Sequence, residues 1–262
     1  MYLAVSIAAT GLTHQLRRID TIANNIANAN TVGFKNARLD FKDALYTTGI
    51  TPGPPRTPAP EGNQQKGHGV LVGAITRDFK QAHLERTERE LDFAIENEGF
   101  FSFASPMGDG EILYSRNGVF ELSVEEDGMY IVNGEGLYLL DVDGNRIQVT
   151  PGANRIAGDI DGTLRFLLGD DELGRAEVGI YTFRNVMGLE LRGNSTYAQV
   201  PSAGVRRQAE NAILRQGVLE GSNIDLAEEM TRVIRTQRAF QLASRALTTA
   251  DEMQGIANNM RR

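Results

Sequence analysis

A few groups of side chains in this sequence have types and spacings that could support chemistry. Asp141, Asp143 and Asn145 alternate along the chain as the oxygen ligands of calcium do, with Gly144 among them. The segment lacks the glycine and the final glutamate of an EF-hand loop at their required positions. Aspartate, asparagine and glycine also form tight turns, so we interpret residues 141–145 as a hairpin turn.

The other reactive side chains lack the context that their chemistry needs. The serines do not lie on a nucleophile elbow, and the three histidines are scattered without metal-ligand spacing. The glycines between Gly67 and Gly73 have the wrong spacing for a nucleotide loop. The acidic run at 170–172 is typical of a solvated turn. We therefore expect no enzyme, no cofactor, and no catalytic or metal site.

The overall composition excludes further classes of protein. The chain has 262 residues and no cysteine, which excludes disulfide scaffolds and cysteine nucleophiles. It carries 27 Lys and Arg against 34 Asp and Glu, and this net charge of −7 disfavours a nucleic-acid partner. No apolar run approaches the length of a membrane span. No positive residue precedes the apolar start of the chain, so we expect no cleaved secretory signal peptide.

The charge is unevenly distributed along the chain. Residues 1–46 have a net charge of +2 and residues 211–262 a net charge of +1, whereas residues 47–210 have a net charge of −10. All 8 prolines and 23 of the 28 glycines also lie in this middle part. Two ends that are compatible with helices therefore flank an acidic centre that is rich in turns.

The N-terminal end has the apolar pattern of a coiled-coil helix. One row of apolar residues recurs every seven positions, and a second row follows four positions after it, which is a coiled-coil seam. The first row is Val5, Leu12, Ile19 and Ile26, and the second is Ala9, Leu16 and Ala23. We expect the helix to stop by Gly33. Asn24 and Asn28 would act either as helix-end residues or as buried residues that fix the register of the seam.

The C-terminal end has the same pattern. Asp225 followed by Glu228 resembles a capping box. The apolar rows behind it are Leu226, Val233, Phe240 and Leu247 with Met230 alongside, and Ala239, Ala246, Met253 and Met260. The predicted helix of about 30 residues, or roughly 45 Å, is typical of a coiled coil or helical assembly. The basic positions 232, 235 and 238 form either a solvated face or a contact with the acidic centre of a neighbour.

The centre of the chain has the pattern of an antiparallel β domain. Short apolar or alternating runs are separated by Asn-Gly and Asp-Gly pairs, which favour hairpins. The runs are 93–104, 112–122, 129–140, 146–149, 164–168 and 178–183. We predict an α+β protein with four parts: a helical segment at 1–45, an extended Pro/Gly-rich connector at 46–69, a β domain at 70–210, and a helical segment at 211–262 that pairs with the first.

Three motifs resemble those of bacterial flagellar rod and hook proteins. The first runs from Asn24 to Lys35, the second covers 92–101 and 114–120, and the third covers 219–225 and 237–240. They occur in the family's order and span nearly the whole chain. The motif residues that we single out are Asn25, Asn30, Gly33, Phe34, Ser222, Asn223, Asp225, Gln237 and Arg238. One departure is the acidic turn at 96–98, where the family more often has small residues.

The resemblance implies a structural subunit that assembles with copies of itself into an open helical tube. In the family, the helical ends pair as a coiled coil in the inner tube, and the tube transmits torque from motor to hook. The implied partners are copies of the chain, neighbouring rod and hook proteins, and the flagellar type III export apparatus, with no small-molecule substrate. The implied location is the basal body in the cell envelope. The expected interface residues are Val5, Leu12, Leu16, Ile19, Asn24, Ile26, Asn28, Leu226, Met230, Val233, Phe240 and Leu247.

The insert at 46–69 is similar to an insert of the distal part of the rod, where the resemblance implies a stiffening role. Its candidate residues are Pro52, Pro54, Pro55, Pro58 and Pro60. One alternative is a proximal rod protein or another axial protein of the hook and rod. An alternative of a different class is a secreted β-domain hydrolase or glycan-binding module.

Overall fold

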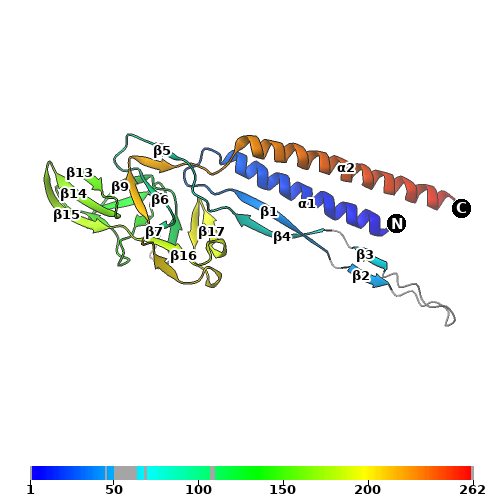
Figure 1. The fold of residues 1–262 in the computed structure, drawn as a ribbon, viewed down its shortest axis with the longest axis horizontal. Helices are drawn as coiled ribbons and strands as arrows, with labels where there is room; N and C mark the ends of the chain where they lie inside the picture. The colour runs from blue at the N-terminus through cyan, green and yellow to red at the C-terminus, as the bar shows by residue number, and fades with distance from the viewer. Residues whose placement is uncertain (1, 45, 50–63, 68–69, 107–109, 261–262) are drawn as a thin grey trace. The chain divides into compact units, whose positions relative to one another are not determined.

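A computed structural model describes residues 2–44, 46–49, 64–67, 70–106 and 110–260 of the chain. The chain divides into two compact units. Unit 1 consists of Met1–Ala27, Ala37–Thr76 and Asp225–Arg262, and unit 2 of Asn28–Asn36 and Arg77–Ile224. The helices are at the chain ends and the sheets between them, which confirms the α+β class (Figure 1).

Unit 1 is built from two long helices and short strand pairs. Helix α1 spans Tyr2–Ala27 and helix α2 spans Leu226–Asn259. They lie side by side in antiparallel directions, so that both chain termini are at the same end of the pair (Figure 1). Strand β1, Ala37–Asp43, pairs with β4, Val70–Arg77, and β2, Tyr46–Gly49, pairs antiparallel with β3, Gln64–Gly67. The five candidate prolines of the connector lie outside the described residues.

Helix α1 ends within the asparagine-rich stretch before Gly33. The last helical residue is Ala27, six positions before Gly33. The backbone and side-chain oxygens of Asn28 accept hydrogen bonds from the Thr31 N–H and hydroxyl, at 3.2 and 3.1 Å. Asparagine competes with the helix for such local bonds. The helix therefore stops before Gly33, at a turn that begins at Asn28.

Helix α2 begins as the sequence predicts. Asp225 Oδ1 accepts hydrogen bonds from the N–H groups of Ala227 and Glu228, at 2.9 and 3.2 Å. These bonds satisfy N–H groups that have no partner within the helix. The Glu228 side chain forms an ion pair with Arg232. Asp225 is therefore the N-cap of a helix of 34 residues.

Most strands of unit 2 belong to one antiparallel sheet. In the described residues this sheet has ten strands, in the order β12-β10-β11-β7-β8-β18-β17, with β9 on β10, β16 on β7 and β19 on β16. Its strands are β7 Phe100–Ala104, β8 Ile112–Ser115, β9 Phe120–Glu125, β10 Gly128–Asn133, β11 Tyr138–Leu139, β12 Gln148–Val149, β16 Ile180–Phe183, β17 Glu190–Gly193, β18 Thr196–Ala198 and β19 Arg206–Gln208.

Smaller sheets and short helices complete unit 2. Strands β13, β14 and β15 form a three-stranded sheet, β6 pairs with β20, and β5 pairs with β21. Their bounds are β13 Arg155–Gly158, β14 Thr163–Leu168, β15 Asp171–Glu177, β6 Phe93–Glu96, β20 Ile213–Gln216, β5 Leu84–Arg86 and β21 Val218–Glu220. The 3₁₀ helices are η1 Val186–Gly188 and η2 Pro201–Ala203.

The turn signals of the sequence lie where strands reverse. Gly128 follows Asp127 between β9 and β10, and Gly162 follows Asp161 between β13 and β14 with a φ of 88°. In the calcium-like segment, Asp141 Oδ1 accepts a hydrogen bond of 2.7 Å from the N–H of Asn145. That carboxylate oxygen therefore closes a turn. The described residues contain no cluster of His, Asp and Glu side chains that could hold a metal ion.

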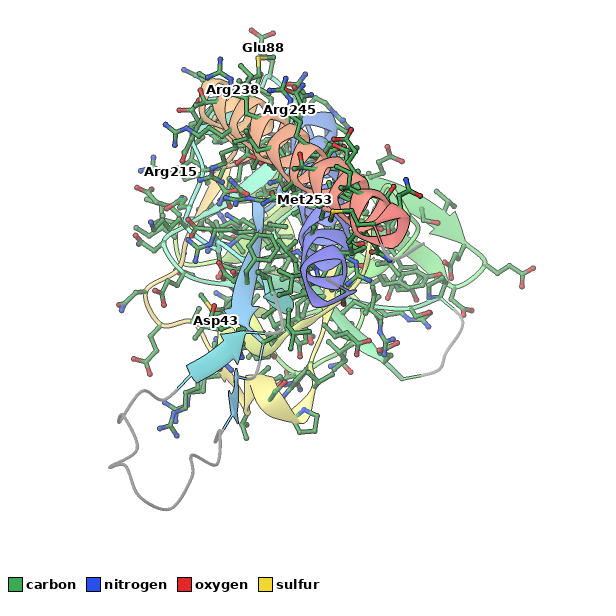
Figure 2. All side chains as sticks on the ribbon, turned by 90° about the vertical axis from the view of Figure 1, so that its right-hand side faces the viewer. Asp43, Glu88, Arg215, Arg238, Arg245 and Met253 are labelled. Carbon is green, nitrogen blue, oxygen red and sulfur yellow. The ribbon has the colours of Figure 1, made fainter. Side chains whose placement is uncertain are left out.

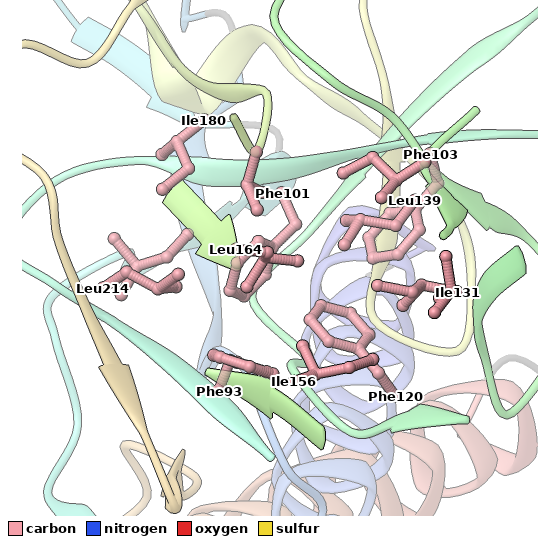
Figure 3. Packing of buried hydrophobic residues seen from close by; sticks show 14 of the residues in the cluster. Phe93, Phe101, Phe103, Phe120, Ile131, Leu139, Ile156, Leu164, Ile180 and Leu214 are labelled. Atoms are coloured by element: carbon pink, nitrogen blue, oxygen red, sulfur yellow. The ribbon is translucent and has the colours of Figure 1, made fainter. Parts of the chain in front are cut away.

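Two apolar clusters hold unit 2 together. Figure 3 shows the larger one, in which phenylalanines from β6, β7 and β9 meet aliphatic side chains from β10, β11 and β14. The Phe101 and Phe120 rings meet edge to face at 5.2 Å. The second cluster gathers Phe100, Tyr114, Tyr181, Phe183 and Tyr197. No helix in the described part of the chain has the length and apolarity needed to cross a membrane.

The buried phenol of Tyr197 predicts how the folding stability changes at alkaline pH. Tyr197 is 1% exposed, and burial raises its pKa from 10.0 to about 12. Between these two values the unfolded chain loses the phenol proton while the folded chain keeps it. Folding stability is therefore unaffected below pH 10 and falls by up to about 3 kcal/mol as the pH rises to 12.

We expect Tyr197→Phe to remove this loss and to move the midpoint of alkaline unfolding to higher pH, as measured by circular dichroism. Tyr130→Phe is the matched control, because Tyr130 is only half-buried. Equal midpoints for wild type and Tyr197→Phe would contradict a penalty from the buried phenol.

Candidate assembly surface and its anchoring clusters

One face of α2 packs against the rest of unit 1. The buried and half-buried positions of this helix repeat with alternating spacings of three and four residues. They include Val233, Thr236, Phe240, Ala243, Leu247 and Ala250. Three of these, Val233, Phe240 and Leu247, belong to the first row that the sequence predicts. This spacing is that of a helix seam.

A second apolar row on α2 is exposed. Four side chains of this row are 57–78% exposed, and they also follow alternating spacings of three and four residues through Ala246 and Thr249. The four are Leu242, Met253, Ile256 and Met260. Figure 2 views the helix pair from the end at which the chain termini lie, and it labels Met253 on α2. A surface helix normally has one apolar stripe, so this second stripe needs a partner of its own.

Helix α1 divides its predicted rows in the same way. Val5, Leu12, Ile19 and Ile26 are half-buried, whereas Leu16 is 48% exposed and Ala9 and Ala23 are exposed. Ile22, which the heptad pattern did not include, is 4% exposed. Each terminal helix therefore packs one row within unit 1 and presents the other row to solvent.

The remaining interface candidates of α2 lie on another face. Leu226 and Met230 are 44% and 56% exposed, and Ile234 continues this row at 51%. Arg235 and Arg238 are exposed, and Arg232 is held by ion pairs to Glu228 and Glu229. Gln237 is also exposed on this helix.

A buried asparagine links α1 to the strand that follows it. Asn25 is 1% exposed, its Nδ2 donates to the Ala37 carbonyl at 2.8 Å, and its Oδ1 accepts from the Ala37 N–H at 3.1 Å. Nδ2 also lies 3.4 Å from Oε2 of the buried Glu229 on α2. The side-chain amide thus pairs with the backbone N–H and carbonyl of one β1 residue, as a neighbouring strand would. Asn24 is exposed and Asn28 half-buried, so Asn25 is the fully buried asparagine of this motif.

Unit 2 contains a buried ionic cluster made from residues of all three motifs. Lys35 and Glu220 are fully buried, with Nζ and Oε1 2.7 Å apart, and Arg116 Nη1 lies 3.0 Å from the other oxygen of Glu220. Glu220 Oε1 also accepts the N–H of Ala82 at 2.9 Å, and Lys35 Nζ donates to the Lys80 carbonyl at 2.7 Å. We call Lys35, Arg116 and Glu220 the ionic cluster.

Two cations share one carboxylate in this cluster, and backbone oxygens complete their coordination. Arg116 donates to the carbonyls of Ile95 and Asn97, at 3.2 and 2.6 Å. Burial lowers the pKa of Lys35 from its usual 10.5, and the charge of Glu220 opposes this effect. A buried charge is tolerated only with such partners. The cluster can therefore fix backbone segments in place.

Two further motif residues bind backbone beside the ionic cluster. Gly33 has a φ of 69°, and a Cβ there would lie 2.7 Å from the backbone nitrogen of Asn117, so only glycine fits. Its N–H donates to the Glu220 carbonyl at 2.8 Å. Asn223 accepts from the Asn36 N–H at 2.7 Å and donates to the Asp78 carbonyl at 2.7 Å. Ser222 is buried, Phe34 half-buried and Asn30 exposed.

Sequence reasoning missed the charged members of these clusters. Lys35, Arg116 and Glu220 lie inside the motifs, but nothing local indicates that they meet, because Lys35 and Glu220 are 185 residues apart. Glu229 was likewise missed in the first turn of α2. One usable signal was that each charged residue of the ionic cluster stands beside small or apolar residues within a motif.

The ionic cluster predicts that Glu220→Gln is strongly destabilising. The variant leaves two buried cations without their carboxylate, so we expect the free energy of unfolding to fall by about 3–5 kcal/mol. Denaturant titration measures the change. The control is Glu90→Gln, whose ion pair with Arg155 is exposed on both sides, and it should change stability by less than about 1 kcal/mol. Similar small effects at both positions would show that the cluster contributes no more than a surface pair.

Three family models match parts of the chain. The model described as "Flagella basal body rod protein" matches residues 6–35, which contain most of α1 and the Asn25 motif. The "Flagellar hook protein FlgE/F/G D1 domain" model matches residues 94–166 in unit 2. The "Flagellar basal body rod FlgEFG protein C-terminal" model matches residues 215–260, which include Glu220 and α2.

Curated relatives match the chain over its full length. The flagellar basal-body rod protein FlgG of Borreliella burgdorferi is 34% identical over 270 residues, which cover 100% of both chains. The protein of the same name from Agrobacterium fabrum is 34% identical and covers 97% of this chain and 98% of its own. A flagellar hook-basal body complex protein, FlhP of Bacillus subtilis, is 28% identical with 97% of each chain covered. The chain therefore belongs to the flagellar basal-body rod protein family and is a structural subunit of the flagellum, not an enzyme.

Proposed function

We propose that this rod subunit assembles with copies of itself into an open helical tube in the distal part of the rod. The terminal helices form the interface between copies, and coiled-coil packing brings the exposed row of one helix against a helix of the next copy. The observation that carries the proposal is the second apolar row of α2, with side chains up to 78% exposed.

The spacing of the exposed row fits a second helix, and burial of its side chains would supply free energy for the contact. Its alternating spacing is that of a coiled-coil seam, and it lies beside the row that already packs in unit 1. Burying a large apolar side chain contributes roughly 1.5–3 kcal/mol. Because a seam on α2 meets a different surface on its neighbour, the contact is heterologous and continues from copy to copy as an open helix.

The remaining assignments extend the same proposal. We assign the assembling ends to 1–45 and 211–262, which contain β1, β20 and β21 besides the two helices, the connector to 46–69 and the β domain to 70–210. The proline-rich connector supports a distal position, where it would stiffen the tube for torque transmission. We assign neighbouring rod and hook proteins and the export apparatus as further partners, with export through the cell envelope. The likeness to a hook-basal body complex protein keeps another axial position as the second candidate.

The exposed row predicts a specific loss of assembly. We expect concentrated wild-type protein to form straight tubes in electron micrographs, and the double variant Met253→Glu and Ile256→Glu to form none, because the new charges cannot be buried between helices. Thr248→Glu is the control, since Thr248 is exposed on α2 outside this row. Equal helix content by circular dichroism verifies folding. Tubes of normal length from the double variant would refute the assigned interface.

The connector predicts a change in stiffness and not in assembly. Deletion of residues 46–69 should leave tubes that bend more, measured as a shorter persistence length in electron micrographs. The control replaces the segment with a Gly/Ser-rich linker of equal length, which is flexible where a proline-rich chain is extended and semi-rigid. Unchanged stiffness in both variants would exclude a stiffening role and remove the main support for a distal position.

A further inference from the structure

Unit 2 has a hollow of about 510 Å³ with an apolar floor. Its floor is formed by Phe79, Phe100, Val186 and Met187. The Phe79 ring packs edge-on against Phe100 at 5.7 Å, and Met187 is 68% exposed. We call this hollow the Phe79 groove. Phe100 is buried and Phe79 and Val186 are half-buried, so Met187 makes this apolar lining accessible to a partner.

The rim of the Phe79 groove is basic. Arg184 is exposed and has no ion-pair partner among the described residues, and Lys80 is exposed with its Nζ 3.7 Å from Asp78. Arg116 also lines the groove, but Glu220 compensates its charge. Glu98 is the acidic side chain of the lining. The groove therefore favours an occupant that combines apolar side chains with negative charge.

The hairpin between β14 and β15 has this combination. Its turn, residues 168–173, carries Leu168 and Leu173 at 50% and 40% exposure. Between them are three exposed carboxylates, Asp170, Asp171 and Glu172, which form no ion pair within the described residues. We call residues 168–173 the acidic tip. In unit 2, strands β13 to β15 lie side by side, at the left of Figure 1.

Other acidic turns of unit 2 fit the groove less well. In the β9–β10 hairpin, Glu125 accepts the hydroxyl of Tyr138. In the turn at 159–162, Asp159 is held by Arg165 at 2.8 Å. The acidic tip differs from both because all of its carboxylates remain available. Its pair of leucines also matches an apolar floor better than the lone Ile160 of the second turn does.

We propose that the acidic tip of one copy inserts into the Phe79 groove of the next copy. The inference rests on the proposed self-assembly and adds a second contact, made by unit 2, to the contact made by the helices. Groove and tip are different surfaces of one subunit, so the contact is heterologous and repeats without closing. Arg184 and Lys80 attract the tip, while the leucines displace water from the floor.

Single-cysteine crosslinking tests this contact cleanly, because the natural chain has no cysteine. Full-length Asp170→Cys and Met187→Cys are mixed, oxidised and separated on a non-reducing gel. We expect the mixed disulfide dimer to form at least about fivefold faster than in a mixture of Val124→Cys and Met187→Cys. Val124 is a matched control because it is 80% exposed on another hairpin. The yield should fall at 1 M salt, where charges more than about 3 Å apart are screened.

A charge exchange distinguishes this contact from non-specific association between copies. Adding Arg184→Glu to the Met187→Cys chain should reduce the crosslinking rate by about tenfold, and adding Asp171→Lys to the Asp170→Cys chain should restore part of it. Equal rates for the tip and control mixtures, with or without tubes, would overturn the inference. Absence of tubes in electron micrographs counts against the proposed self-assembly, whereas tubes without the tip crosslink refute only the groove contact.

Discussion

The arrangement of unit 2 depends on one buried carboxylate, Glu220, which is shared by two buried cations. Lys35 and Arg116 come from segments far away in the chain, and all three side chains also bind backbone groups. Removing a partner from such a cluster is costly, because the remaining charge stays desolvated. The ionic cluster therefore acts by specifying which segments meet. Two of its members, Lys35 and Glu220, lie with Gly33 and Asn223 within a few residues of the points where the chain passes between the two units.

On the unit 1 side of these points, Asn25 performs a similar task with neutral groups. Its amide makes both hydrogen bonds to one residue of β1 and contacts Glu229 on α2. A hydrophobic contact could not replace it, because the N–H and carbonyl of Ala37 would be left buried without these partners. The motif asparagine therefore fixes where the helix stops and the strand starts. A structural subunit needs these connecting segments to have one fixed conformation, because any variation in them would recur in every copy of the assembly.

Local patterns in the sequence predicted most of the elements but few of their contacts. The heptad rows, the Asp225 cap and the Asp-Gly turns depend on neighbouring residues, so sequence spacing was enough to find them. Strands β1 and β4 were missed because they are partly exposed and paired across a long insertion. The end of α1 was placed only to within a few residues, because several asparagines precede the glycine. The ionic cluster could not be predicted, since no periodicity relates Lys35 to Glu220.

In the proposed assembly, the exposed row of α2 must stay soluble in a single copy and still bind when copies meet. Two features of the row reconcile these needs. Thr249 and Ala246 interrupt its large apolar side chains, and Arg245 and Glu252 lie close beside it, so no long continuous apolar patch is formed. A single contact of this kind is weak. Along a helical assembly every copy makes this contact, and many linked weak contacts together give a high avidity. The same row can thus remain dissociated before assembly and become cooperative once several copies are aligned.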